Sequence, residues 1–189
     1  MAHAGVSRLL YDCNRPPTAP DCIPGQSERF EVPGNRDLSR ADRAARARLI
    51  HDPFHAGVAA LIAAHQDRVA GPLTIITVHT FTPVFLGEPR AVQIGFLHDE
   101  NAALSVAAHE AEAKAGIYAS ALNEPYAAAD GVTYSLARHA EAEGRHSTMI
   151  EVRNDLVDTA EAARDMARHL ADTLRHSMAK VLPTMESAT

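Results

Sequence analysis

The chain has 189 residues, of which 46% are hydrophobic, and its formal net charge at pH 7 is -6. This length predicts one domain with a substantial core, and the charge argues against nucleic-acid partners, which require clustered Lys and Arg. No apolar run approaches the roughly 20 residues of a membrane-spanning helix, and residues 1–10 lack a signal-peptide pattern. We therefore expect a cytoplasmic protein that keeps Cys13 and Cys22 reduced.

Strands and helices alternate in the expected order of elements. The sequence predicts a strand at 7–12, a Pro- and Gly-rich loop at 13–35, a helix at 38–69, strands at 73–79 and 91–99, a helix at 101–116, a strand at 117–122, a helix at 133–144, a strand at 147–155 and a helix at 159–181. Such alternation is typical of an α/β fold with a mixed, largely parallel sheet.

Helix boundaries have recognisable residues. Ser39 is a plausible N-cap for the first helix. Pro53 should kink or split that helix, because proline lacks the amide proton that an interior turn requires. Gly116 and Gly144 are expected to end the next two helices.

Polar side chains gather where the predicted strands end. They are Asp12, Asn14 and Arg15 after the first strand, His79 after the second, Asn123, Glu124 and Tyr126 after the fourth, and Glu151 and Arg153 in the fifth. Ligands of open α/β sheets bind at the carboxyl ends of strands. His79 at such an end suits a metal or a substrate, and the alternative is a histidine that only caps its strand.

Glu151 is the most unusual of these residues, because its strand is apolar. Burying a carboxylate is costly unless it is paired or used. Glu151 and Arg153 share one face by the two-residue period, so the pair is either a structural ion pair or part of a site. One imidazole, one carboxylate within a strand and the Asn14–Arg15 pair together fit metal-assisted hydrolysis of an anionic acyl compound.

The remaining histidines are weaker candidates. His51 and His55, in "HDPFH", have the i, i+4 spacing of a metal pair on a helix, although Pro53 lies between them. His169 and His176 are expected on a solvated helix face.

Six motifs in order, "SRLLYDCNRPP", "VPGN", "HDPFH", "VHTFTPVFLG", "NEPY" and "IEVRNDL", resemble the N-formylglutamate amidohydrolase family through nearly the whole chain. That family is related to zinc carboxypeptidases, so the resemblance implies a single-domain three-layer α/β fold like theirs. It also implies hydrolysis of N-formyl-L-glutamate, or a similar N-acyl amino acid, to formate and L-glutamate at the end of histidine breakdown.

The resemblance assigns roles to individual residues. "DCNR" is similar to the Asp-Leu-Asn-Arg motif of carboxypeptidases, which makes Asn14 and Arg15 ligands of the substrate carboxylate. "HTFTP" makes His79 a zinc ligand, and "IEVR" makes Glu151 the general base that activates a metal-bound water. Arg153 would orient Glu151 or bind a second carboxylate. Tyr126 and Tyr134 would bind substrate or close over it.

Family members have a further strand and a "Cys-Asp-His-Ala"-like motif well before "DCNR", which would supply the other zinc ligands. Here "DCNR" begins at residue 12, so we expect residues 1–189 to form one domain that is truncated relative to the family. His3 is a possible substitute ligand. The alternative to an active enzyme is a catalytically impaired remnant that binds an amino-acid carboxylate without turnover. The sequence leaves the oligomeric state open.

Overall fold

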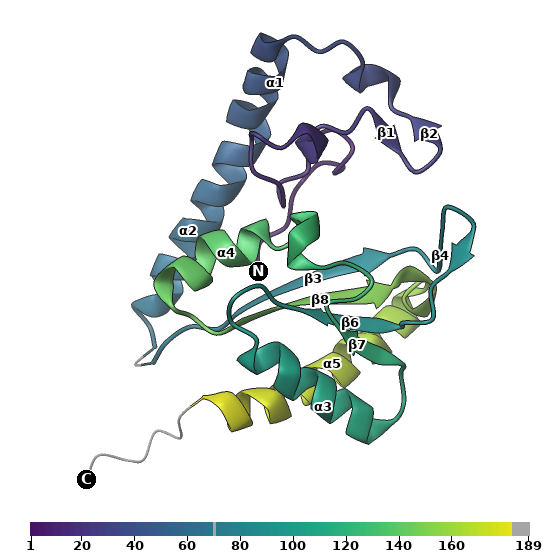
Figure 1. Ribbon diagram of the computed structural model, residues 1–189. Coiled ribbons are helices and arrows are strands. Elements are labelled where there is room, and N and C mark those ends of the chain that lie inside the picture. Colours follow the sequence, from purple (N-terminus) through teal and green to yellow (C-terminus); the bar gives the residue numbers. More distant parts are fainter. Residues whose placement is uncertain (70, 183–189) are drawn as a thin grey trace.

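The computed structural model describes residues 1–69 and 71–182 (Figure 1). Its helices are α1 (Arg40–Arg46), α2 (Asp52–Gln66), α3 (Ala103–Ala115), α4 (Tyr134–His139) and α5 (Ala160–Val181). Its strands are β1 (Gln26–Ser27), β2 (Phe30–Glu31), β3 (Ile75–Phe81), β4 (Val84–Phe85), β5 (Glu88–Pro89), β6 (Ile94–Leu97), β7 (Ser120–Leu122) and β8 (Ser147–Arg153). Short 3-10 turns lie at Pro20–Cys22, Pro33–Asn35, Ala128–Asp130, Glu141–Glu143 and Asn154–Leu156.

The central sheet has four strands in the order β3-β8-β6-β7. Strand β3 runs parallel to β8, β6 runs parallel to β7, and β6 is antiparallel to β8. The prediction of a mixed, largely parallel sheet is therefore confirmed. Strands β1–β2 and β4–β5 form two small separate hairpins.

Helices cover both faces of the sheet (Figure 1). Alternate residues of β6 and β8, such as Phe96 and Ile150, pack against Met166 and Leu170 of α5 on one face. On the other face, Leu97 and Met149 pack against Leu136 of α4 and its neighbour Val132. None of the helices within residues 1–69 and 71–182 is both long and apolar enough to cross a membrane.

Residues 7–12 form a turn, so the prediction of a strand there is wrong. The amide of Tyr11 donates to the carbonyl of Ser7, and the amide of Asp12 donates to the carbonyl of Cys22. Tyr11 is buried in a small cluster with Cys13, Cys22 and Ile23. The apolar side chains of this segment are therefore buried locally, without pairing in the sheet.

The first long helix runs through Pro53 without a break (Figure 1). Ser39 caps it, and its side chain accepts from the amide of Asp42 in a capping box. A π-helical turn, Ala47–His51, joins α1 to α2, so that the amide of Asp52 donates to Ala47. This wider turn comes just before Pro53, near the start of α2, and it accommodates the helix hydrogen bond that proline cannot donate.

His169 lies in the contact between α3 and α5, so the prediction that it is solvated is wrong. Its Nε2 lies 2.6 Å from Oε2 of Glu112, which is fully buried, and Thr173 donates to the same oxygen. His176, about two turns further along α5, is exposed as expected. The partner on α3 lies 57 residues away, and the period of α5 alone does not reveal it.

Candidate active site

His79 and Glu151 are direct neighbours in the sheet. They are register partners on the parallel strands β3 and β8, and Gly95 of β6 faces Glu151 from the other side. Paired residues point to the same face of a sheet, which here is the face that α4 covers. The sequence placed both residues on strands, and the fold brings their side chains together near the carboxyl ends of β3 and β8.

The chain crosses directly over Gly95. A Cβ atom on Gly95 would lie 1.9 Å from the main-chain oxygen of Glu124, a distance that no side chain tolerates. Glycine at this position therefore lets the segment after β7 pass close to Glu151. This requirement explains why a glycine interrupts the apolar strand β6.

Gly95→Ala should push the Glu124 main chain away from β6 and destabilise the fold by about 1–3 kcal/mol or more, as overpacking does. Gly57→Ala is a matched control, because nothing lies within 4 Å of its added Cβ. In helix α2 that change should be neutral or stabilising by up to about 1 kcal/mol. Denaturant unfolding of both variants measures the difference, and equal stabilities would contradict the close approach.

Glu151 is a buried carboxyl group with a raised pKa. Its side chain is 3% exposed, and its Oε2 atom has no hydrogen-bond partner. Burial raises the pKa of Glu151 to about 7, and the charges of Arg8, Arg90 and Arg15 oppose this rise. A carboxyl group with a pKa near neutrality suits general acid–base catalysis.

His79 is kept in its neutral form. Burial lowers its pKa, the carboxylate of Asp12 acts in the opposite direction, and Arg8 and Arg15 lower it further. The ring of His79 makes no hydrogen bond to the residues that the structure describes. A neutral imidazole with a free nitrogen can bind a metal ion or accept a proton.

Asn14 and Arg15 lie in the loop that faces this pair. Asn14 uses both ends of its amide at the start of α4: its Nδ2 donates to the carbonyl of Val132, just before the helix, and its Oδ1 accepts from the amide of Ser135 in its first turn. Arg15 donates from Nε to Asp21 at 2.7 Å and from Nη1 to Gly131 at 3.0 Å. Its Nη2 has no partner among the described residues and is available to an anion.

Arg153 does not pair with Glu151, contrary to the simplest prediction. It forms a double ion pair with Asp155, at 2.8 and 3.1 Å. Its Nη1 donates to the main-chain oxygen of Arg90 at 3.1 Å. The competing carboxylate lies two residues further along, where β8 has ended and the chain turns back. Arg153 therefore supports the segment that carries Arg90. The sequence did not indicate Arg90 or Arg8, whose charges act on Glu151.

The two predicted tyrosines are engaged differently. Tyr126 packs near Leu97 and Met149, and its hydroxyl accepts a hydrogen bond from Arg90 at 3.1 Å. The Tyr134 hydroxyl lies 3.2 Å from Nε2 of His51 and accepts from Arg138 at 2.6 Å. Tyr134 thus contacts α2, and its predicted role in substrate binding stays a prediction.

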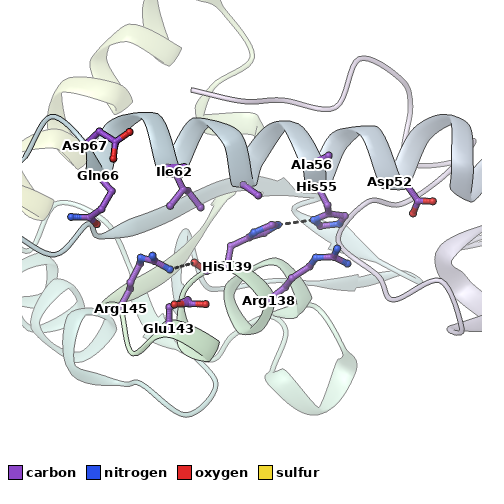
Figure 2. A pocket seen from close by; sticks show the side chains of 12 residues that line it. Asp52, His55, Ala56, Ile62, Gln66, Asp67, Arg138, His139, Glu143 and Arg145 are labelled. Carbon is purple, nitrogen blue, oxygen red and sulfur yellow. Dashed lines mark hydrogen bonds between the residues drawn. The ribbon is translucent and has the colours of Figure 1, made fainter.

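His51 and His55 form hydrogen bonds within the protein. Nε2 of His55 donates to the carbonyl of Cys13 at 2.9 Å. Its Nδ1 is therefore the acceptor in the 2.8 Å contact with Nε2 of His139, which Figure 2 shows. Burial lowers the pKa of His55 to about 4, which keeps this arrangement neutral. We call the chain His139–His55–Cys13 the histidine relay. His51 lies 2.8 Å from the Asp52 carboxylate.

A groove of about 690 Å³ lies beside the relay, between α2 and the segment around α4 (Figure 2). Its lining combines apolar α2 side chains such as Ala59 with polar and charged side chains, namely Asp52, His55, Gln66, Asp67, Arg138, His139, Glu143 and Arg145. None of the residues that the family resemblance assigns to catalysis or substrate binding lines this groove. The groove and the His79–Glu151 pair are therefore separate features.

The described residues do not make up a catalytic zinc site. Within residues 1–69 and 71–182, no group of three or more His, Cys, Asp or Glu side chains is placed to hold a metal ion. A catalytic zinc takes three protein ligands, and His79 supplies one. The predicted zinc at His79 therefore lacks its other ligands here, and neither His3 nor His55 completes the set.

Comparisons with known proteins agree with the sequence motifs. The family model described as N-formylglutamate amidohydrolase matches residues 2–157. The crystal structure of gene product Atu2144 from Agrobacterium tumefaciens matches with a TM-score of 0.87 and 37% sequence identity. That match covers 92% of this chain and 68% of the Atu2144 chain. A search of curated proteins gave no match.

Proposed function

Because the chain belongs to the N-formylglutamate amidohydrolase family, whose members are metal-dependent, we propose that it hydrolyses N-formyl-L-glutamate or a similar N-acyl amino acid. Family membership suggests an amidohydrolase, and the substrate and the residue roles are the proposal. The observation that carries it is Glu151, a buried carboxylate with an unpaired oxygen beside the neutral imidazole of His79.

Glu151 is the proposed general base. It takes a proton from water as the hydroxyl oxygen bonds to the formyl carbon, and it then gives that proton to the amide nitrogen as the C–N bond breaks. The products are formate and the free amino acid. A pKa of about 7 lets the same carboxyl group accept and return a proton near neutral pH. His79, the register partner of Glu151 on β3, is the proposed ligand of the metal that the activity requires.

Arg15 is the proposed anchor for the substrate α-carboxylate. Its Nε and Nη1 are fixed by Asp21 and Gly131, so the free Nη2 is held in one orientation. A planar guanidinium of this kind suits a carboxylate. Asn14 supports the same loop through Val132 and Ser135, and any contact of its amide with substrate would compete with these bonds.

The second candidate is a protein that binds the carboxylate without turnover. One observation favours it: the described residues offer His79 without the further ligands that a catalytic zinc needs. In this case Arg15 would still hold an anion, and Glu151 would have no activated water to deprotonate.

Formate release from N-formyl-L-glutamate, with and without added zinc, separates the two functions. The hydrolase candidate predicts formate release together with stoichiometric metal, which elemental analysis of the purified protein measures. His79→Ala should lower both the rate of formate release and the metal content. Binding of N-formyl-L-glutamate in calorimetry with no formate and no metal supports the second candidate. A protein that neither binds N-formyl-L-glutamate nor releases formate would contradict both candidate functions.

A further inference from the structure

Arg90 lies above the same face of the sheet as Glu151. It follows β5, and its guanidinium carbon lies 5.5 Å from the ring centroid of Phe81, 4.6 Å from that of Phe85 and 5.0 Å from that of Tyr126. Phe81 is two residues beyond His79 on β3, so both side chains point to one face. Arg90 therefore lies next to the His79–Glu151 pair, toward the carboxyl ends of β3 and β8.

Arg90 has no carboxylate partner among the described residues. Its Nη1 donates to the Tyr126 hydroxyl at 3.1 Å and to the Thr82 carbonyl at 3.4 Å, and its Nε and Nη2 make no hydrogen bond there. The other two arginines whose charges act on Glu151 are each paired with an aspartate, Arg8 with Asp12 and Arg15 with Asp21. Arg90 is thus a cation that the aromatic rings hold in place and that no described anion neutralises.

The backbone of Arg90 is also fixed. Its amide donates to the Pro83 carbonyl at 2.8 Å, and its carbonyl accepts from Arg153 at 3.1 Å. Arg153 is held in turn by Asp155. A guanidinium that is fixed before an anion arrives loses little conformational freedom on binding.

We propose that Arg90 binds the side-chain carboxylate of the substrate and so selects N-acyl derivatives of dicarboxylic amino acids. This inference rests on the proposed function, in which Arg15 takes the α-carboxylate. N-formyl-L-glutamate carries two carboxylates, and the site then offers one free guanidinium edge for each: Nη2 of Arg15 and the Nε–Nη2 edge of Arg90. Arg153, which the sequence suggested for the second carboxylate, is occupied by Asp155 and acts by holding Arg90 in position.

The test compares N-formyl-L-glutamate with N-formyl-L-glutamine, which replaces the second carboxylate by a neutral amide of the same shape. Dissociation constants are measured by calorimetry in the Glu151→Gln background, so that neither compound is consumed, and kcat/KM is measured with Glu151 intact. The chain with Arg90 should prefer the glutamate derivative by about 10- to 100-fold, the usual worth of a hydrogen bond to a charged group. Arg90→Gln should remove this preference and leave binding of the glutamine derivative nearly unchanged.

Arg29→Gln is the matched control, because Arg29 also stacks on a ring, that of Phe30 at 5.2 Å, on the small β1–β2 hairpin. It should keep the full preference. If Arg90→Gln does not fold, the ¹⁵Nε signal of Arg90 in the unsubstituted chain provides the same test: it should shift with N-formyl-L-glutamate and stay in place with N-formyl-L-glutamine.

The outcomes separate this inference from the proposed function. Preferential binding that depends on Arg90, without formate release, supports the inference and contradicts the hydrolase. Formate release supports the hydrolase, and if Arg90→Gln keeps the same preference for the glutamate derivative as the unsubstituted chain, the inference is overturned. The inference is also overturned if the unsubstituted chain does not prefer N-formyl-L-glutamate over N-formyl-L-glutamine. The same holds if the ¹⁵Nε signal of Arg90 does not shift with N-formyl-L-glutamate.

Discussion

Glu151→Gln is expected to lower formate release by about 10²–10⁴-fold, the usual contribution of a positioned general base. The amide has the same shape and accepts no proton, so the fold should be retained. In the unsubstituted enzyme, kcat/KM should rise with pH through about 7, as Glu151 loses its proton. Rate measurements from pH 5 to 9 check both statements, and near-normal turnover by the glutamine variant would exclude Glu151 as the base.

The same substitution should stabilise the protein above neutral pH. The pKa of Glu151 is raised from 4.5 to about 7 in the folded state. Its contribution to stability is therefore fully present below pH 4.5 and is lost as pH rises through 7. At about 1.4 kcal/mol per unit, this loss amounts to about 3 kcal/mol by pH 8, and Glu151→Gln removes it.

Urea unfolding of the two proteins at pH 5 and pH 8 measures this difference. The glutamine variant should gain stability relative to Glu151 between the two values. A structural role for Glu151 predicts the reverse, because loss of a needed carboxylate would destabilise the variant at pH 8. Loss of rate with gain of stability would mark a residue retained for its chemistry.

The second large effect is expected at the histidine relay. His55→Ala should destabilise the protein by about 2–5 kcal/mol at pH 7, because it leaves a cavity and removes the partners of Cys13 and His139. His65→Ala is the control, since His65 lies on the same helix, is exposed and bonds only the carbonyl of Leu61. Its cost should stay within about 0.5 kcal/mol.

The relay should also make the protein sensitive to acid. Burial lowers the pKa of His55 from 6.5 to about 4, and His51, Arg138 and His139 oppose its protonation further. The contribution of His55 to stability is therefore present above pH 6.5 and is lost as pH falls through 4. This loss amounts to about 3 kcal/mol, and the pKa of His139 is shifted in the same direction.

Unfolding free energies of the unsubstituted chain and of His55→Gln, measured between pH 7 and pH 4, isolate this contribution. The unsubstituted chain should lose more stability over the interval, because glutamine does not titrate. Parallel pH dependence in the two proteins would show that the relay accepts protons without cost. Acid stability should remain unchanged in the His65→Ala control.

Several features were determined by the sequence alone. Ser39 with Asp42 and Thr159 at the start of α5 bond the first free amides of their helices, and Gly116 adopts the left-handed conformation that ends α3. These are contacts within four residues, so the local pattern contains all the information. The motif order predicted the family, and the apolar runs around His79 and Glu151 correctly placed both residues on strands.

The tertiary structure decided which polar groups meet. Glu151 was expected to pair with Arg153, but Asp155 binds that arginine. Glu151 is instead buried, and the charges of three more distant arginines act on it. Two of the rings that hold Arg90, Phe81 and Phe85, precede it in the same stretch of chain, but Tyr126 comes from the distant segment after β7, and no sequence pattern links these rings to the arginine.

Two other differences have the same physical cause. His169 finds Glu112 on α3, and residues 7–12 bury Tyr11 against Cys22 without joining the sheet. Helix caps and strand periods depend on neighbours along the chain. Ion pairs, aromatic contacts and the burial of a single side chain depend on segments that only folding brings together.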